Sequence, residues 1–147
     1  MKYNKHDLYI YISDENLKLY KNIINGIKDK FEYAYVIKIK TDSPKSMIEL
    51  IQKFMNKHHC LHIFCETMYF TFLHNIPNKS NIYILNLKPI MSSQNYTCAA
   101  YKNGFQILDP YSYNVKKLKR FNCSTNVFNL YPQYNFTDFE IKFEKFL

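Results

Sequence analysis

The chain has 147 residues, a formal net charge of +8 and a hydrophobic content of 47%. This length and composition predict one globular α/β domain spanning residues 1–147, and they exclude a disordered chain. No apolar run reaches the roughly 18 residues that a membrane span requires, and the polar start at residues 1–7 is not typical of a secretory signal. We therefore expect a cytoplasmic protein that has no membrane partner.

Strand and helix patterns alternate up to residue 89. Apolar residues have helical spacing after Ser13 or Asp14, one of which is expected to cap the helix. The same spacing follows the Ser43-Pro44 pair and recurs at residues 67–76. Apolar runs predict strands at residues 8–12, 33–39, 61–64 and 82–87. This order predicts an α/β fold with a mostly parallel sheet of about four strands in βαβαβαβ order, flanked by helices.

The pattern changes after residue 89. Residues 96–101 and 105–108 flank the tripeptide Lys102-Asn103-Gly104, and Asn-Gly tolerates the positive φ angles of a tight type I′ turn. We therefore expect a C-terminal β-hairpin extension of the sheet. Short strands are also expected at residues 116–121 and near 127–130, whereas the pattern over the rest of residues 122–147 does not decide between strand and helix.

The basic charge is a weak argument for nucleic-acid binding. Arg120 is the single arginine, although arginine is the residue that grips phosphate and guanine with two hydrogen bonds. The abundant Lys, Ile and Tyr have A/T-rich codons, so the basicity is also typical of an A/T-rich genome, such as that of a virus or a mobile element. The densest basic cluster is the expected polyanion patch: Lys116, Lys117, Lys119 and Arg120.

Polar residues follow several of the predicted strands, and ligands of open α/β sheets bind beyond the carboxyl ends of the strands. Carboxylates at this rim can act as acids and bases, hold a hard cation or bind a sugar, whereas Asp and Ser also cap helices. Between Asp7 and Pro89 the only glycine is Gly26, which excludes the usual glycine-rich phosphate loops. The candidate rim residues are Asp14, Asp42, Ser43, Glu66, Thr67 and Lys88.

A group of histidines and cysteines near residue 60 looks like a metal site by composition. On a strand, Cys60 and His62 face one side and Cys65 faces the other, so one ion does not easily gather both cysteines. We therefore expect helix-end and core roles, with no metal and no cofactor. The residues concerned are His58, His59, Cys60, His62 and Cys65.

Two resemblances bear on enzymatic activity. The expected hairpin, which ends at Asp109-Pro110, looks like the strand pair of papain-like proteases, but no histidine follows His74 and a Cys-His-Asp triad cannot form in that order. Residues 44–109 are similar in order to the nucleotide-sugar half of bacterial two-domain sialyltransferases, through a Ser43-Pro44 helix start and the strands at 61–64 and 81–89. The His-Pro dipeptide of that family is absent here, so the likeness implies a related fold and no more.

The sequence favours a protein that acts through protein–protein interaction, as a regulator, an inhibitor or a subunit. It has neither a glycine-rich loop nor a triad, whereas tyrosines in loops and an apolar helix at 67–76 are typical of interfaces. The partner is another protein or a second copy of the chain. The alternative is an enzyme, or a degenerate one, that binds a nucleotide or nucleotide-sugar at the rim. The expected partner contacts are Met68, Tyr69, Phe72, Tyr111 and Tyr113.

Overall fold

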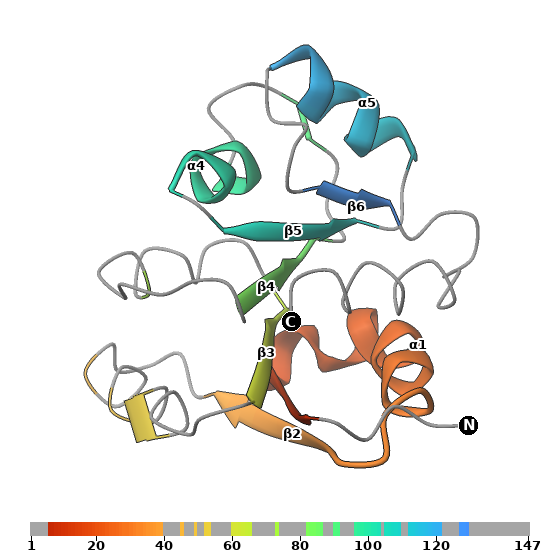
Figure 1. Ribbon diagram of the computed structural model, residues 1–147, viewed down its shortest axis with the longest axis vertical. Helices are drawn as coiled ribbons and strands as arrows, with labels where there is room; N and C mark the ends of the chain where they lie inside the picture. The colour runs from red at the N-terminus through yellow and green to blue at the C-terminus, as the bar shows by residue number, and fades with distance from the viewer. Residues whose placement is uncertain are drawn as a thin grey trace. The chain divides into compact units, whose positions relative to one another are not determined.

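The chain divides into two compact units, Met1–Cys65 and Glu66–Leu147 (Figure 1). Whether both units belong to one domain, as the sequence predicts, stays a prediction. The computed structural model describes residues 6–39, 60–65, 82–86, 90–91, 96–103, 105–109, 112–121 and 127–129, together with Lys45, Glu49, Gln52, Lys53 and Leu73.

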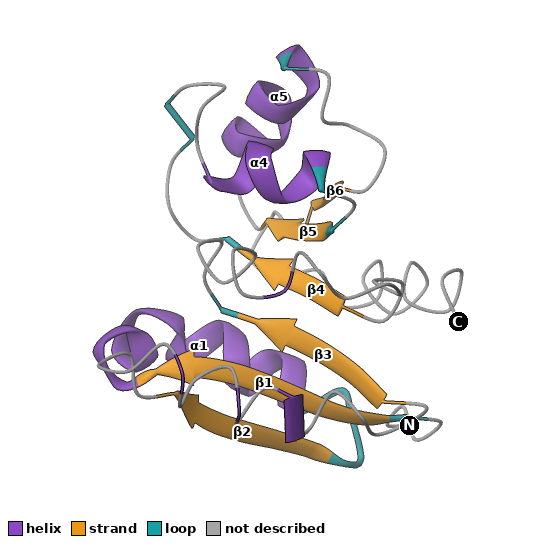
Figure 2. Ribbon diagram, turned by 90° about the vertical axis from the view of Figure 1, so that its left-hand side faces the viewer, coloured by secondary structure: helices purple, strands orange, loops and turns teal. Residues whose placement is uncertain are grey.

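The first unit holds three parallel strands in the order β2-β1-β3. A 3-10 turn and helix α1 connect β1 to β2, and α1 lies against one face of the strands (Figure 2). The buried residues of α1 recur every three or four positions, as expected for a helix with one apolar face. The elements are β1 (Asp7–Ser13), η1 (Asp14–Asn16), α1 (Leu17–Lys28), β2 (Ala34–Ile39) and β3 (Cys60–Phe64).

Strand β1 lies between β2 and β3, and its side chains are buried on both faces from Leu8 to Ser13. This confirms the prediction from its unbroken apolar run. Because side chains alternate along a strand, Leu8 and Ile10 face one side and Tyr9 and Tyr11 face the other. The two faces therefore differ in chemistry, one aliphatic and one aromatic.

The aromatic layer consists of Tyr9, Tyr11, Tyr35, His62 and Phe64, which the strand register places on one face of β2, β1 and β3. The Tyr9 ring stacks on Tyr35 and on His62, with centroid distances of 5.4 Å and 5.8 Å. Tyr11 stacks on Phe64 at 4.2 Å with an interplanar angle of 4°. Offset aromatic pairs of this kind contribute about 1 kcal/mol each beyond their buried area.

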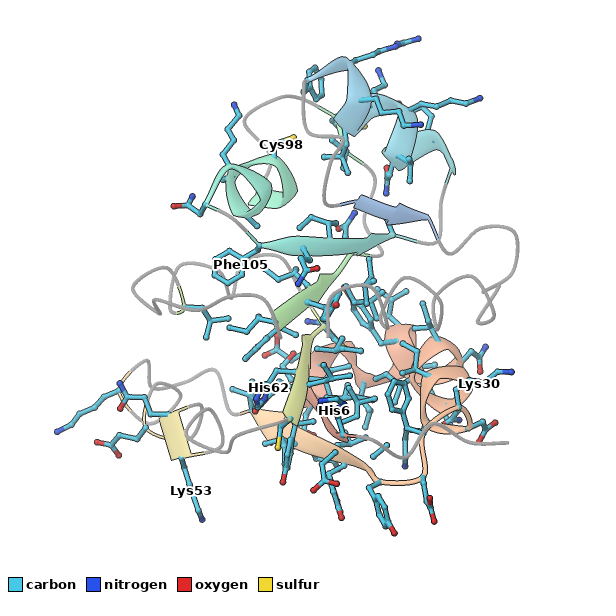
Figure 3. The ribbon with its side chains drawn as sticks, viewed as in Figure 1. His6, Lys30, Lys53, His62, Cys98 and Phe105 are labelled. Atoms are coloured by element: carbon cyan, nitrogen blue, oxygen red, sulfur yellow. The ribbon has the colours of Figure 1, made fainter. Side chains whose placement is uncertain are left out.

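His62 is fully buried in this layer, and Figure 3 shows it on the side of β3 away from α1. A 2.8 Å hydrogen bond joins its Nδ1 to Oη of Tyr11. Among the residues that the structure describes, its Nε2 has no hydrogen-bond partner. Burial lowers the pKa of His62 to about 4, and burial also raises the pKa of Tyr11, with smaller contributions from Tyr9 and Cys60. Both groups are therefore neutral at pH 7, and the core role predicted for His62 is confirmed.

The second unit holds three further parallel strands in the order β4-β5-β6. Helix α4 contacts β5, and helix α5 contacts both β5 and β6. All strand pairs described in the two units are parallel, which confirms the α/β class, and β6 confirms the strand expected near 127–130. The elements are β4 (Ile82–Leu85), α4 (Tyr96–Lys102), β5 (Gln106–Asp109), α5 (Ser112–Arg120) and β6 (Val127–Asn129).

The predicted β-hairpin is wrong, because its first arm is helix α4 and its second arm, β5, pairs in parallel with β4. The backbone N–H of Asn103 donates to Ala99 O and Ala100 O at 3.1 Å, and its side-chain amide donates to Ala99 O at 2.7 Å. The N–H of Phe105 donates to Ala100 O at 3.1 Å. These bonds close a helix C-terminus, for which Asn-Gly is as typical as it is for a hairpin.

Two further predictions need correction. The strand expected at residues 116–121 is the last part of α5, because the buried Val115 and Leu118 have helical spacing. Ser13 forms no capping bond through its side chain, and its Oγ instead accepts a hydrogen bond from Asn16 Nδ2 at 3.0 Å.

The helices predicted after Ser43-Pro44 and at residues 67–76 lie largely outside the described residues. Lys45, Glu49, Gln52 and Lys53 are helical and exposed, and Leu73 is helical and buried. In the part of the chain that the structure describes, no helix has both the length and the apolar character needed to cross a membrane.

The depressed pKa of His62 predicts a loss of stability in mild acid. In the unfolded chain the imidazole takes up a proton near its ordinary pKa of 6.5, but in the folded chain it does so only near 4. The unfolded state therefore binds more protons between these values, and stability falls as the pH drops through this window. We expect His62 to account for a loss of about 3 kcal/mol between pH 7 and pH 4.

This contribution is measured by urea unfolding of the wild type and of His62→Phe at several pH values. The variant keeps an aromatic ring beside Tyr9 but does not titrate, so its stability should fall less steeply between pH 6.5 and pH 4. Equal slopes for wild type and His62→Phe would show that the imidazole is not the source.

Candidate functional site

A fully buried carboxylate lies at the carboxyl end of β5 in the second unit. Asp109 is the last residue of β5, and its Oδ2 accepts hydrogen bonds from Asn86 Nδ2 at 2.8 Å and from Asn114 Nδ2 at 3.0 Å. Oδ1 of Asn114 accepts the backbone N–H of Ile90 at 2.9 Å. We call Asn86, Asp109 and Asn114 the Asp109 cluster.

The Asp109 cluster joins three segments that are distant in sequence. Asn86 follows directly after β4, Asp109 ends β5, and Asn114 lies in the first turn of α5. All three side chains are nearly or fully buried. A buried carboxylate is tolerated only when hydrogen bonds replace its lost hydration, so each asparagine has to stay in place. The cluster therefore fixes α5 relative to the ends of β4 and β5.

Helix α5 has a buried side and an exposed side. Asn114, Val115 and Leu118 are buried, whereas the remaining described side chains are exposed or half-exposed. Tyr113 keeps 52% of its surface exposed, and the Lys117 ammonium lies 5.5 Å from the centroid of its ring. We call the outward residues the basic face of α5: Tyr113, Lys116, Lys117, Lys119 and Arg120.

The basic face carries one sign of charge only. No acidic residue occurs between Ser112 and Arg120, and three of the four cations lie in the last turn of the helix. Cations are favoured there because the carbonyl end of a helix carries partial negative charge. The helix thus supports a concentration of positive charge that attracts anionic surfaces. Tyr113 adds an exposed aromatic ring beside the cations.

The structure describes one of the six predicted rim residues, Asp14. Its Oδ1 lies 3.7 Å from Nζ of Lys38 on β2, and both side chains are exposed. An exposed pair of this kind contributes little to stability and leaves Asp14 a surface residue. The other predicted rim residues lie outside the described part: Asp42, Ser43, Glu66, Thr67 and Lys88.

One of the five partner candidates lies on the same helix as the four polyanion candidates. Tyr113 was predicted as a partner contact and the four basic residues as a separate patch, yet all five lie on α5. Met68, Tyr69, Phe72 and Tyr111 lie outside the described residues, and so do His58 and His59. Within the described ranges, no group of three or more His, Cys, Asp and Glu side chains is placed to hold a metal ion.

Sequence reasoning missed the Asp109 cluster. Asp109 stands at the end of an apolar run, so the rule about the carboxyl ends of strands applies to it as it does to Asp14, whereas Asn86 lies inside the strand expected at residues 82–87. Asp109-Pro110 instead ends the expected hairpin, because Asp-Pro is typical of turns. The role of Asn114 depended on recognising α5 as a helix.

Comparisons with protein-family models, with curated proteins and with solved structures found no match to this chain.

The Asp109 cluster predicts that substitution by alanine costs much more stability at Asn114 than at Asn103. Asn114→Ala removes two amide contacts from a buried carboxylate and leaves the N–H of Ile90 without its acceptor, so we expect a loss of about 2–3 kcal/mol of unfolding free energy. Asn103→Ala removes one exposed hydrogen bond at the end of α4 and should cost about 1 kcal/mol or less.

Both variants are compared by urea unfolding at pH 7. If Asn114→Ala costs no more than Asn103→Ala, the cluster does not hold α5 in place. Near-UV spectra of the folded variants show whether the aromatic side chains keep their native packing. The unfolding free energies are compared only between variants that keep it.

Proposed function

We propose that this chain is a binding protein that docks an acidic surface of a protein partner on the basic face of α5. One observation carries the proposal: an exposed tyrosine stands among four cations, on a helix whose opposite side is held by the buried Asp109 cluster. A rigid helix presents these groups in a fixed pattern, which favours recognition over loose electrostatic attraction.

The composition of the basic face favours a protein over a nucleic acid. Tyr113 offers a large aromatic surface of the kind that anchors protein interfaces. Arg120 is the single arginine of the chain, so bidentate contacts to phosphate or guanine are scarce. Lysines at the margin of an interface steer an acidic partner and reject a basic one.

A nucleotide or nucleotide-sugar site at the strand ends has less support. Asp14 lies at the surface beside Lys38. The Asp109 carboxylate is fully buried and accepts hydrogen bonds from both asparagines, which favours a structural role over contact with a ligand.

The proposal is tested with two acidic peptides of equal charge, a glutamate homopolymer and a peptide of alternating glutamate and leucine, at about 150 mM salt. We expect the mixed peptide to bind more tightly, because leucine can pack on Tyr113. Tyr113→Ala should weaken the mixed peptide selectively, by about tenfold. Tyr33→Ala, at a tyrosine of similar exposure in the first unit, should leave both affinities unchanged.

Charge is tested with two matched double variants. Lys116→Glu/Lys119→Glu reverses two exposed cations on α5 and should reduce peptide binding at least tenfold. Lys18→Glu/Lys21→Glu makes the same change with the same spacing on α1, where both lysines are also exposed. Equal losses in the two variants would mean that net charge alone drives binding.

Nucleic acid forms the second arm of the experiment. Duplex DNA and single-stranded RNA of the same charge as the peptides are titrated under the same conditions. Either nucleic acid could bind more tightly than the peptides, with a steep salt dependence that Lys116→Glu/Lys119→Glu abolishes. This result would show that the basic face binds a nucleic acid and would overturn the proposed protein partner.

A further inference from the structure

Strand β2 stands at the end of the strand order β2-β1-β3, and in the described part of the chain it pairs with β1 alone. The N–H of Leu8 donates to Tyr33 O at 2.8 Å, and Leu8 is in register with Ala34. In a parallel ladder, alternate residues bond to the same neighbour. The peptide groups of Ala34, Val36 and Lys38 therefore point away from β1, toward the outer edge.

Two side chains along this edge are exposed. Tyr35 is 45% exposed and Lys38 is exposed, whereas Val36 and Ile37 are half-buried. Edge strands normally carry several charges or a proline that prevent pairing with another chain. In β2 the one charged residue, Lys38, stands next to the last position, and the centre of the strand is apolar.

We infer that two copies of this chain pair through β2, antiparallel, about a two-fold axis at Val36. In this register Ala34 faces Lys38 of the partner subunit, and Tyr35 faces Ile37 of the partner subunit. The outward peptide groups of the two edges then complement each other and form about six backbone hydrogen bonds. The tyrosine–isoleucine pair joins an aromatic and a β-branched side chain, a favourable cross-strand combination.

The arrangement of charge favours this antiparallel pairing of two copies. A parallel pairing in register places Lys38 beside Lys38 of the partner subunit, and directly opposed like charges destabilise a sheet. The two-fold pairing instead separates the two lysines to opposite ends of the shared segment. The two-fold pairing also uses the outer edge of both β2 strands. Assembly through β2 therefore stops at a dimer and does not continue into a fibre.

The stacking of Tyr35 is a second reason to expect pairing at this edge. Its ring lies 5.4 Å from Tyr9, which in turn stacks on the buried His62. The exposed ring is therefore the outer end of the aromatic layer, and it is held in place before a second copy arrives. Pairing places Ile37 of the partner subunit beside this ring.

The test measures the oligomeric state of the full chain by sedimentation equilibrium between about 1 µM and about 100 µM. We expect a monomer–dimer equilibrium in this range. Tyr35→Lys should raise the dimer dissociation constant at least tenfold, because it places a cation opposite an apolar residue. Leu19→Lys adds the same charge at an exposed leucine of α1, away from the edge, and should leave the constant unchanged.

Two further variants test the register and the backbone. Tyr35→Lys/Ile37→Glu should restore dimerisation relative to Tyr35→Lys, because the new opposite charges face each other across the axis. Val36→Pro removes an N–H that points outward and should abolish the dimer while the ladder to β1 persists. Far-UV spectra of every variant confirm that it is folded.

A monomer at all concentrations would overturn the inference, and so would a dimer that Tyr35→Lys and Val36→Pro leave intact. Equal weakening by Leu19→Lys and Tyr35→Lys would also overturn it, because the effect would then be one of net charge. The measurement involves no acidic partner, so its outcome does not depend on the function proposed for α5.

Discussion

The second unit depends on one buried carboxyl group, that of Asp109. Removing a polar side chain from water is costly unless hydrogen bonds replace its hydration. Asp109 receives such bonds from Asn86 and Asn114, which belong to different segments of the chain. An arrangement of β4, β5 and α5 that separated these residues would leave the Asp109 carboxyl without these hydrogen bonds in an apolar interior. The cluster thus gives α5 one well-defined position, and the proposed interface depends on that position.

The first unit also contains polar groups in its interior. Tyr11 and His62 are both buried, and both are kept neutral there. A hydrogen bond joins the two side chains, and stacked rings pack against them. The same layer extends outward to Tyr35 at the edge of the sheet, so a core feature also shapes the surface at which we place the second copy.

Sequence patterns predicted β1 and β3 because each is an unbroken apolar run with buried side chains. They failed where one motif serves two structures: Asn103-Gly104 is compatible with a hairpin and with the end of α4. They also failed at α5, whose few apolar residues gave a weak signal for its helical period. The basic residues and Tyr113 of the site were predicted individually, but their common helix was not. The contacts of Asp109 are tertiary, and no local pattern specifies which amides reach it.

The position of Lys117 over the Tyr113 ring has a consequence for the strength of the proposed association. A free lysine side chain samples many rotamers and loses much of that freedom when a partner immobilises it. In the unbound protein the ammonium group already lies 5.5 Å from the centroid of the ring, where a cation–π contact favours this arrangement. Part of the ordering cost is thus met during folding, and a larger share of the contact energy remains for affinity.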